Sequence, residues 1–227
     1  MNCTIQNMYD LTHTIAAPLL EKYEYPWEVL PHIGDFIREI GPKLDKSLYE
    51  AKGDDVYIAK TVKFVNEPTN TIKGPCIIGP GTEVRPGAFI RGNAIIGADC
   101  VVGNSTEIKN DIIFDNVEVP HYNYVGDSVL GFHAHMGAGS ITSNIKSDRT
   151  NVVIKDFSTG EKIETGLRKI GAMLGDYAEV GCNTVMNPGS IIGPHTNIYP
   201  LSMIRGVIPA DSIVKNKAGQ EIVSKTE

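Results

Sequence analysis

Residues 72–108, IKGPCIIGPGTEVRPGAFIRGNAIIGADCVVGNSTEI, carry an aliphatic residue at every sixth position. These residues are Ile72, Ile78, Val84, Ile90, Ile96, Val102 and Ile108. Residues 174–204 keep the same spacing with Leu174, Val180, Met186, Ile192, Ile198 and Ile204. A period of six differs from the period of about 3.6 of an α-helix and of about 2 of a strand, and it is typical of a hexapeptide parallel β-helix. The sequence therefore predicts an all-β solenoid in which each side of a coil directs one aliphatic side chain inward.

The repeat does not cover the whole chain. Residues 1–53 carry helical stripes, and we expect a small N-terminal helical cap that hides the open edge of the first coil. The alternative is that this cap contacts the substrate. Residues 54–227 are predicted to form the β-helix domain, in which the repeat slips by one residue between Ile108 and Ile113. The polar stretch at about 142–168 lacks the repeat and predicts a loop or hairpin extruded from the coils.

Charge and cysteine content restrict the partners. The net charge of −6 disfavours nucleic acid, which requires a basic surface. The N-terminal segment has no Lys or Arg before Lys22 and only short apolar runs, so we expect neither a signal peptide nor contact with a membrane. The cysteines are Cys3, Cys76, Cys100 and Cys182, without a C-x-x-C pair. We therefore predict reduced thiols and a cytoplasmic location.

Three of the six histidines, His121, His133 and His135, lie where the repeat is most disturbed. A catalytic zinc site would need three convergent ligands and an open position, and this spacing disfavours it, so we predict no metal. One histidine could instead act as a general base, which typically contributes a factor of about 10²–10⁴ to the rate. The remaining alternative is that these histidines are solvated corner residues.

Spacing favours His121 as the base. Arg85 lies 36 residues earlier, which is two coils if each coil takes three hexads. At a strand separation of ~4.8 Å the two residues would be roughly 10 Å apart along one edge. A cation and a base at that distance suit a small anionic substrate, and Lys109 could join Arg85 in binding a phosphate.

Residues 107–144, EIKNDIIFDNVEVPHYNYVGDSVLGFHAHMGAGSITSN, carry three more specific motifs. They are Glu-x-Lys, then His-x-x-Tyr-x-Gly-Asp, then Gly-Ala-Gly-Ser-Ile-Thr-x-Asn. This run resembles the acetyltransferase half of the bifunctional glucosamine-1-phosphate N-acetyltransferase / UDP-N-acetylglucosamine pyrophosphorylase family. The resemblance covers most of residues 72–206, and residues 25–30 are similar to the linker before this half in archaeal-type members. It implies a left-handed β-helix and a homotrimer with sites between subunits.

The resemblance also implies roles for individual residues. His121 would be the catalytic base that deprotonates the sugar amine, and Glu107 would orient or polarise it. The substrate-binding residues would be Arg85 and Lys109 for the phosphate, Tyr124 for the sugar, and Asn144 for the reacting amide or thioester. The backbone of Ala138 and the residue Cys182 would line the groove for acetyl-coenzyme A.

The sequence departs from the family pattern at several points. His135 stands where bacterial members place a sugar-contacting Asn. The next phosphate-binding Lys of the family has no aligned counterpart, and the candidates are Lys146, Arg149 and Lys155. No glycine-rich nucleotide-binding signature precedes the solenoid, so we expect no uridylyl transfer by this chain.

The expected function is acetyl transfer from acetyl-coenzyme A to the amine of an amino-sugar 1-phosphate, a step of UDP-N-acetylglucosamine biosynthesis. Two alternatives stay open. The chain could be an acyltransferase for another sugar or nucleotide sugar. It could also be a non-catalytic protein that binds a sugar phosphate or a nucleotide sugar.

Overall fold

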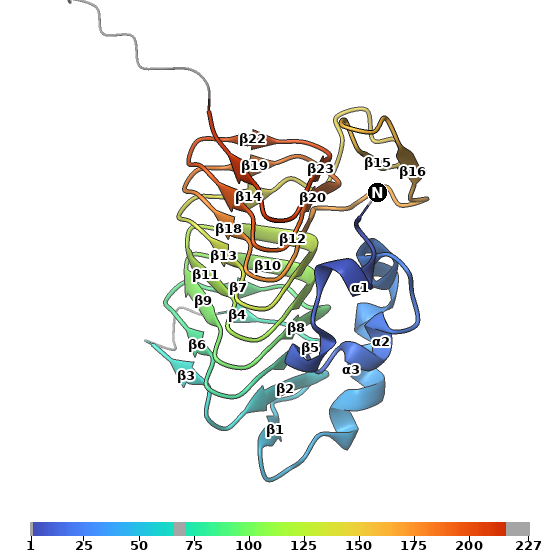
Figure 1. Cartoon of the computed structure of the whole chain (residues 1–227). Helices are drawn as coiled ribbons and strands as arrows, with labels where there is room; N and C mark the ends of the chain where they lie inside the picture. Colours follow the sequence, from blue (N-terminus) through green and yellow to red (C-terminus); the bar gives the residue numbers. More distant parts are fainter. Residues whose placement is uncertain (1, 66–70, 217–227) are drawn as a thin grey trace, which may run out of the picture.

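The computed structural model describes residues 2–65 and 71–216. They form a left-handed parallel β-helix of about nine turns, with short helices packed along one side (Figure 1). The predicted fold class is confirmed. Each full coil contributes a strand to each of three faces, which we number 1 to 3 in chain order. Corner A joins faces 1 and 2, corner B joins faces 2 and 3, and corner C leads from face 3 to face 1 of the next coil. No helix in the described stretches is long and apolar enough to cross a membrane.

The strands of each face pair in parallel from coil to coil. Face 1 consists of β2 (Val56–Ala59), β5 (Cys76–Ile78), β8 (Ala94–Ile96), β17 (Ala172–Leu174), β20 (Ser190–Ile192) and β23 (Val207–Ile208). Face 2 consists of β3 (Lys63–Phe64), β6 (Glu83–Val84), β9 (Val101–Asn104), β11 (Glu118–His121), β13 (His135–Met136), β18 (Glu179–Val180), β21 (Asn197–Ile198) and β24 (Ile213–Val214). Face 3 consists of β4 (Thr71–Ile72), β7 (Phe89–Ile90), β14 (Ile141–Thr142), β19 (Val185–Met186) and β22 (Met203–Ile204). Two longer strands, β10 (Glu107–Ile113) and β12 (Tyr124–Leu130), turn corner C and belong to faces 3 and 1.

The inward positions are those that the six-residue period predicts. All of the predicted aliphatic residues are buried except Ile72, which is half-buried. The predicted slip is confirmed as well, because Ala94 pairs with Asp111, 17 residues later, whereas Cys76 pairs with Ala94, 18 residues later. A second 17-residue coil follows, in which Asp111 pairs with Ser128. Both short coils lose their residue at corner C, so β10 and β12 run through this corner without interruption.

Face 1 is apolar on its outer side as well. Its outward residues Ile77, Ile95, Ile112, Val129, Met173 and Ile191 are all fully buried. The helical segments that precede the solenoid are α1 (Ile5–Met8), η1 (Leu11–His13), α2 (Ala17–Leu20), η2 (Pro26–His32), α3 (Ile33–Ile40) and η3 (Gly41–Lys43). Of these, α3 contacts β5, β8 and β10, and η2 contacts β12 (Figure 1). The N-terminal segment therefore lies along face 1 rather than across the end of the solenoid, because the outer row of Ile and Val must be removed from water.

The open edge of the first coil is covered by a strand. Strand β1 (Tyr49–Ala51) pairs antiparallel with β2, so it occupies the hydrogen-bonding positions that a preceding coil would use. An unpaired edge would be a template for association with other chains. The helices and β1 thus divide the work that the sequence suggested for one cap.

The segment between β14 and β17 leaves the coils at corner C. It contains the antiparallel hairpin of β15 (Val153–Lys155) and β16 (Lys162–Glu164), and it returns at Ile170. Val152 and Ile154 on this excursion are buried. The excursion therefore packs on its own solenoid and needs no neighbouring chain to support it.

The cysteines follow the prediction of reduced thiols. Cys3, Cys76 and Cys100 are buried, Cys182 is exposed, and all four are free. Burial raises the pKa of Cys3 to about 11 and the pKa values of Cys76 and Cys100 to about 12. These three thiols stay protonated at neutral pH.

The covered outer row of face 1 should contribute strongly to stability. We expect Ile95→Ala to lower the free energy of unfolding by about 2–5 kcal/mol, because it leaves a cavity between β8 and the cap. Ile213→Ala is the matched control, since Ile213 is 59% exposed and should lose less than about 1 kcal/mol. Urea denaturation of the two variants measures the difference. Equal losses would show that the cap does not cover face 1 in solution.

Candidate active site

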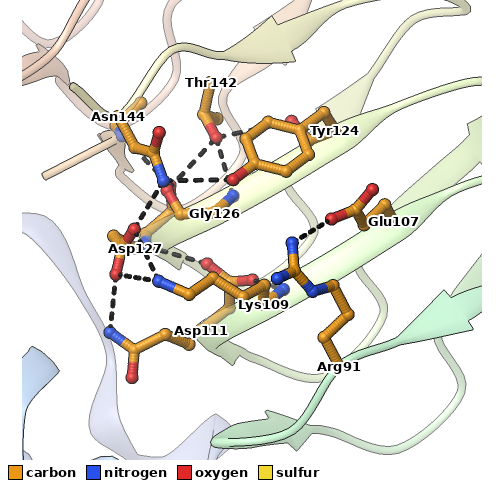
Figure 2. A network of polar contacts seen from close by, with 12 residues as sticks. Arg91, Glu107, Lys109, Asp111, Tyr124, Gly126, Asp127, Thr142 and Asn144 are labelled. Carbon is orange, nitrogen blue, oxygen red and sulfur yellow. Dashed lines mark hydrogen bonds and ion pairs between the residues drawn. The ribbon is translucent and has the colours of Figure 1, made fainter. Parts of the chain in front are cut away.

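A polar network occupies corner C and the adjoining part of face 3 (Figure 2). Its centre is Asp127, which is 3% exposed and has a left-handed backbone. The Lys109 ammonium contacts its two carboxylate oxygens at 2.9 and 3.0 Å, and Asn110 donates to it at 2.9 Å. The side-chain amide of Asn144 donates to the same carboxylate at 2.5 Å. Three of the predicted substrate-binding residues, Lys109, Tyr124 and Asn144, are thus brought together by a carboxylate that the sequence analysis did not single out.

Tyr124 is held as a neutral phenol. Its oxygen accepts a hydrogen bond of 3.0 Å from the Asn144 amide. Burial, followed by the charge of Asp127, raises the pKa of Tyr124 above its usual value. The phenol therefore keeps its proton, which remains available to donate to a ligand. Gly126 permits this ring position, because a Cβ there would lie 2.5 Å from the phenol oxygen.

Asp111 fixes the shortened corner beneath this network. Its fully buried carboxylate accepts backbone hydrogen bonds from Lys109 at 2.7 Å and from Ser128 at 2.8 Å, and so joins two successive coils. Burial raises the pKa of Asp111 well above its usual value. Asp111 has no exposed surface, so its role is to hold the backbone from which Lys109 projects.

An arginine that the sequence analysis missed lies beside the network. Arg91 bonds to Glu107 at 2.7 Å, and this bond raises the pKa of the guanidinium (Figure 2). Since Ile90 pairs with Ile108, Arg91 and Lys109 occupy equivalent positions on adjacent coils. The signal was available, because Arg91 precedes Lys109 by 18 residues, which is one full coil. The same stacking rule had been applied only to Arg85.

Arg85 lies elsewhere, at corner B, with its guanidinium on Glu83 at 2.6 Å. The strand register places Arg85 level with Pro120 two coils later, next to His121. The expected stacking of Arg85 and His121 two coils apart along one edge is therefore present. Lys109 does not join them, because it lies across face 3 at corner C.

His121, Ala138 and Cys182 form one column along corner B. The His121 carbonyl accepts from Gly139 at 3.0 Å, and the Ala138 carbonyl accepts from Asn183 at 2.8 Å, so the three residues follow each other on successive coils. Strand pairing gives the same alignment. The column combines an exposed imidazole, a small residue and an exposed thiol. Two predicted coenzyme-lining residues are thus in line with the predicted base.

The ring of His121 has no hydrogen-bond partner within the described part of the chain. Glu107, the residue expected to orient it, instead binds Arg91. Within one chain the structure therefore does not join Glu107 to His121.

The other two histidines of the cluster point to different surroundings. His135 bonds to Glu118 at 2.9 Å, and His133 stacks on Tyr177 at corner A with ring centroids 5.5 Å apart. No group of three or more His, Cys, Asp or Glu side chains among residues 2–65 and 71–216 is arranged to hold a metal ion.

A cavity of about 330 Å³ adjoins the network at corner C. Lys109, Asn110 and Asp127 line one side, and Arg168 and Lys169 line another. These two cations lie where the excursion returns to the coils, directly before Ile170. The sequence analysis placed the extra phosphate-binding cation at Lys146, Arg149 or Lys155, none of which lines this cavity. A segment without a repeat offers no register, so the sequence could not place Arg168 and Lys169.

The N-terminal segment also reaches this cavity. Leu30 and Pro31 of η2 form part of its wall. The alternative role considered for the cap, contact with a substrate, is therefore geometrically open to these two residues.

Comparison with known proteins agrees with this arrangement. Residues 72–200 match the family described as GMPPB C-terminal domain. The bifunctional protein GlmU of Methanococcus aeolicus is 38% identical over 174 residues, which are 69% of this chain and 41% of that protein. GlmU of Methanococcus maripaludis is 32% identical over 219 residues, 88% of this chain and 48% of that protein. The chain thus spans less than half the length of these two relatives.

Among solved structures, the acetyltransferase domain of PglB from Neisseria gonorrhoeae aligns with 78% of this chain and 61% of its own, at 13% identity and a TM-score of 0.32. The sequence matches agree with the resemblance to the acetyltransferase half of GlmU-like proteins. Because residues 72–200 make up more than half of the 227 residues, the chain belongs to the GMPPB C-terminal domain family, on the GlmU-like acetyltransferase side of it.

Proposed function

We propose that the chain transfers an acetyl group from acetyl-coenzyme A to the amine of an amino-sugar 1-phosphate. The observation that carries the proposal is the arrangement of two sets of residues on either side of face 3. Cations, a neutral phenol and an amide gather at corner C, and an exposed imidazole stands at corner B in line with Ala138 and Cys182. The relatives named GlmU at 32–38% identity support a sugar-related acyltransferase.

The sugar phosphate binds at corner C in this proposal. Arg91 and Lys109 supply two cations on adjacent coils, and Arg168 and Lys169 add two more at the neighbouring cavity. Such cations suit a phosphate dianion. Lys109 is already paired with Asp127, so this carboxylate orients its ammonium and lowers its net attraction for the phosphate. Tyr124 donates its hydroxyl proton to the sugar.

His121 acts as the general base. An ammonium cannot attack a thioester, so the amine transfers a proton to the imidazole at or before attack. The amine nitrogen then forms a bond to the thioester carbonyl carbon, the carbon–sulfur bond breaks, and coenzyme A leaves as the thiol. The backbone at Ala138, next along the column, is positioned to stabilise the developing oxyanion, and Cys182 lines the path of the coenzyme.

The complete site lies between two subunits of a trimer. Within one chain, face 3 separates His121 from Lys109, and Glu107 is bonded to Arg91 instead of to His121. A second chain placed against this edge would bring corner B of one subunit toward corner C of the next. Large apolar side chains are exposed in this region, with Tyr122 at 65%, Leu201 at 74% and Met203 at 64%.

The first prediction concerns the assembly. Light scattering on the purified chain should give about three times 24.7 kDa, because closed cyclic assemblies bury such exposed apolar residues. Leu201→Asp should shift the molecule toward the monomer and reduce activity with it. A monomer with full activity at micromolar concentration would contradict a site between subunits.

The second prediction concerns the base. His121→Ala should lower kcat for acetyl transfer by about 10²–10⁴ and leave the affinity for acetyl-coenzyme A nearly unchanged, because the imidazole acts on the proton. His133→Ala is the control, since His133 lies at corner A. A normal kcat for His121→Ala would refute this assignment. If the parent chain bound sugar phosphate but transferred no acetyl group, the non-catalytic alternative would hold.

The third prediction separates the two arginines. Arg91→Ala should raise KM for the phosphorylated acceptor by about tenfold or more, because it removes a charge-assisted hydrogen bond next to Lys109. Arg85→Ala should raise KM less, since Arg85 lies at corner B on Glu83. The unphosphorylated amino sugar is the control, with which the two variants should differ little. A larger effect of Arg85→Ala would restore the phosphate role that the resemblance gave it.

A further inference from the structure

A larger cavity lies between the excursion and the last coils. Its volume is about 470 Å³, within the usual range for small-molecule sites. On the excursion it is lined by Lys146, Lys155 and Phe157, and on the solenoid by Asn187, Arg205 and Gly206. It lies at corner C, one coil beyond the acceptor site, because Thr142 pairs with Met186. Neither the proposed base nor the proposed phosphate-binding residues line it.

The shape of this cavity is fixed by close packing. Two glycines with left-handed backbones let the excursion approach the coils. A Cβ at Gly189 would lie 2.6 Å from Val152, and one at Gly206 would lie 2.7 Å from the ring of Phe157. Val152 and its neighbour Ile154 are buried. The excursion is therefore held against the solenoid, and its residues keep their places on the cavity wall.

The lining is basic although the chain as a whole carries a charge of −6. Lys146 contacts Asp148 at 3.5 Å, which neutralises one of the three cations. Within the described residues, Lys155 and Arg205 have no ion-pair partner. Two unpaired cations facing one cavity favour an anion with at least two charges, such as a phosphate.

An aromatic ring stands beside these cations. Phe157 is 68% exposed, an unusual position for a large apolar side chain unless its ring face is used. A flat ligand ring can stack on Phe157 while its phosphate contacts Lys155 and Arg205. Phosphate alone would not need the ring.

We propose that this cavity binds the nucleotide part of a small molecule, with the phosphate on Lys155 and Arg205 and the base on Phe157. Two sources share this chemistry. One is the phosphorylated adenosine end of coenzyme A, and the other is a nucleotide or nucleotide sugar that regulates the enzyme. The site is distinct from the acceptor site, so it does not depend on which amino sugar is acetylated.

Calorimetric titration of the full chain with ADP tests the proposal directly. The double variant Lys155→Ala/Arg205→Ala should weaken ADP binding by about tenfold or more, because charge-assisted contacts are lost. Phe157→Ala should weaken ADP binding but leave the weaker binding of inorganic phosphate unchanged. Lys63→Ala, in β3 near the opposite end of the solenoid, is the matched control. Lys155→Arg should retain binding.

Two further ligands identify the source. If the double variant weakens coenzyme A and raises KM for acetyl-coenzyme A, the donor occupies the cavity. If it weakens UDP-N-acetylglucosamine and leaves that KM unchanged, a regulator does. ADP binding that is absent in the parent, or equal in parent, Phe157→Ala and double variant, would overturn the proposal. His121→Ala should bind ADP normally, so the nucleotide site can fail while the acetyl-transfer proposal stands, and the reverse.

Discussion

The main-chain pairing of each coil with the next is the constraint on which the molecule depends. A single coil has too small an interior to be stable, so every coil relies on its neighbours for backbone hydrogen bonds and for burial of its aliphatic residues. The parallel register is kept from Val56 in β2 to Val214 in β24. Functional groups are consequently placed by counting coils. Side chains far apart in the sequence, such as those of His121 and Cys182, become neighbours on one edge.

The candidate site arises where this regularity is relaxed. Two coils of 17 residues draw corner C tight, and Asp111 satisfies the backbone N–H groups of both. Buried polar groups are tolerated only when they are hydrogen-bonded, and here the network of Asp127 with Lys109 and Asn144 meets that condition. The same tight corner that removes a residue from the repeat thus presents an ammonium and an amide on one rigid surface.

Much of the fold could be predicted from the sequence, and only part of the site. The six-residue period marks inward residues directly, which is why Ile78 and Ile192 were assigned correctly. The outward Ile77 and Ile95 are equally apolar, and this second row was a signal that face 1 is covered. Stacking by whole coils could have found Arg91, which the analysis passed over in favour of a motif at Arg85.

Other site residues could not be predicted from the period. Arg168 and Lys169 lie on the excursion, which has no repeat, and their position depends on the packing of Val152 and Ile154. The link between Lys109 and Asp127 joins two coils through side chains, and the pattern of aliphatic residues carries no information about it. Tertiary packing decides these positions.

The excursion begins and ends at almost the same point in space. The backbone N–H of Ile170 donates to the carbonyl of Asn144 at 3.0 Å, so the chain re-enters the coil next to where it left. For the solenoid, residues 145–169 are nearly invisible. The entropy cost of such a closed insertion rises only with the logarithm of its length. Both cavity walls that this insertion supplies can therefore be lengthened, shortened or replaced while every coil stays in register, which separates the freedom to change ligands from the requirement to fold.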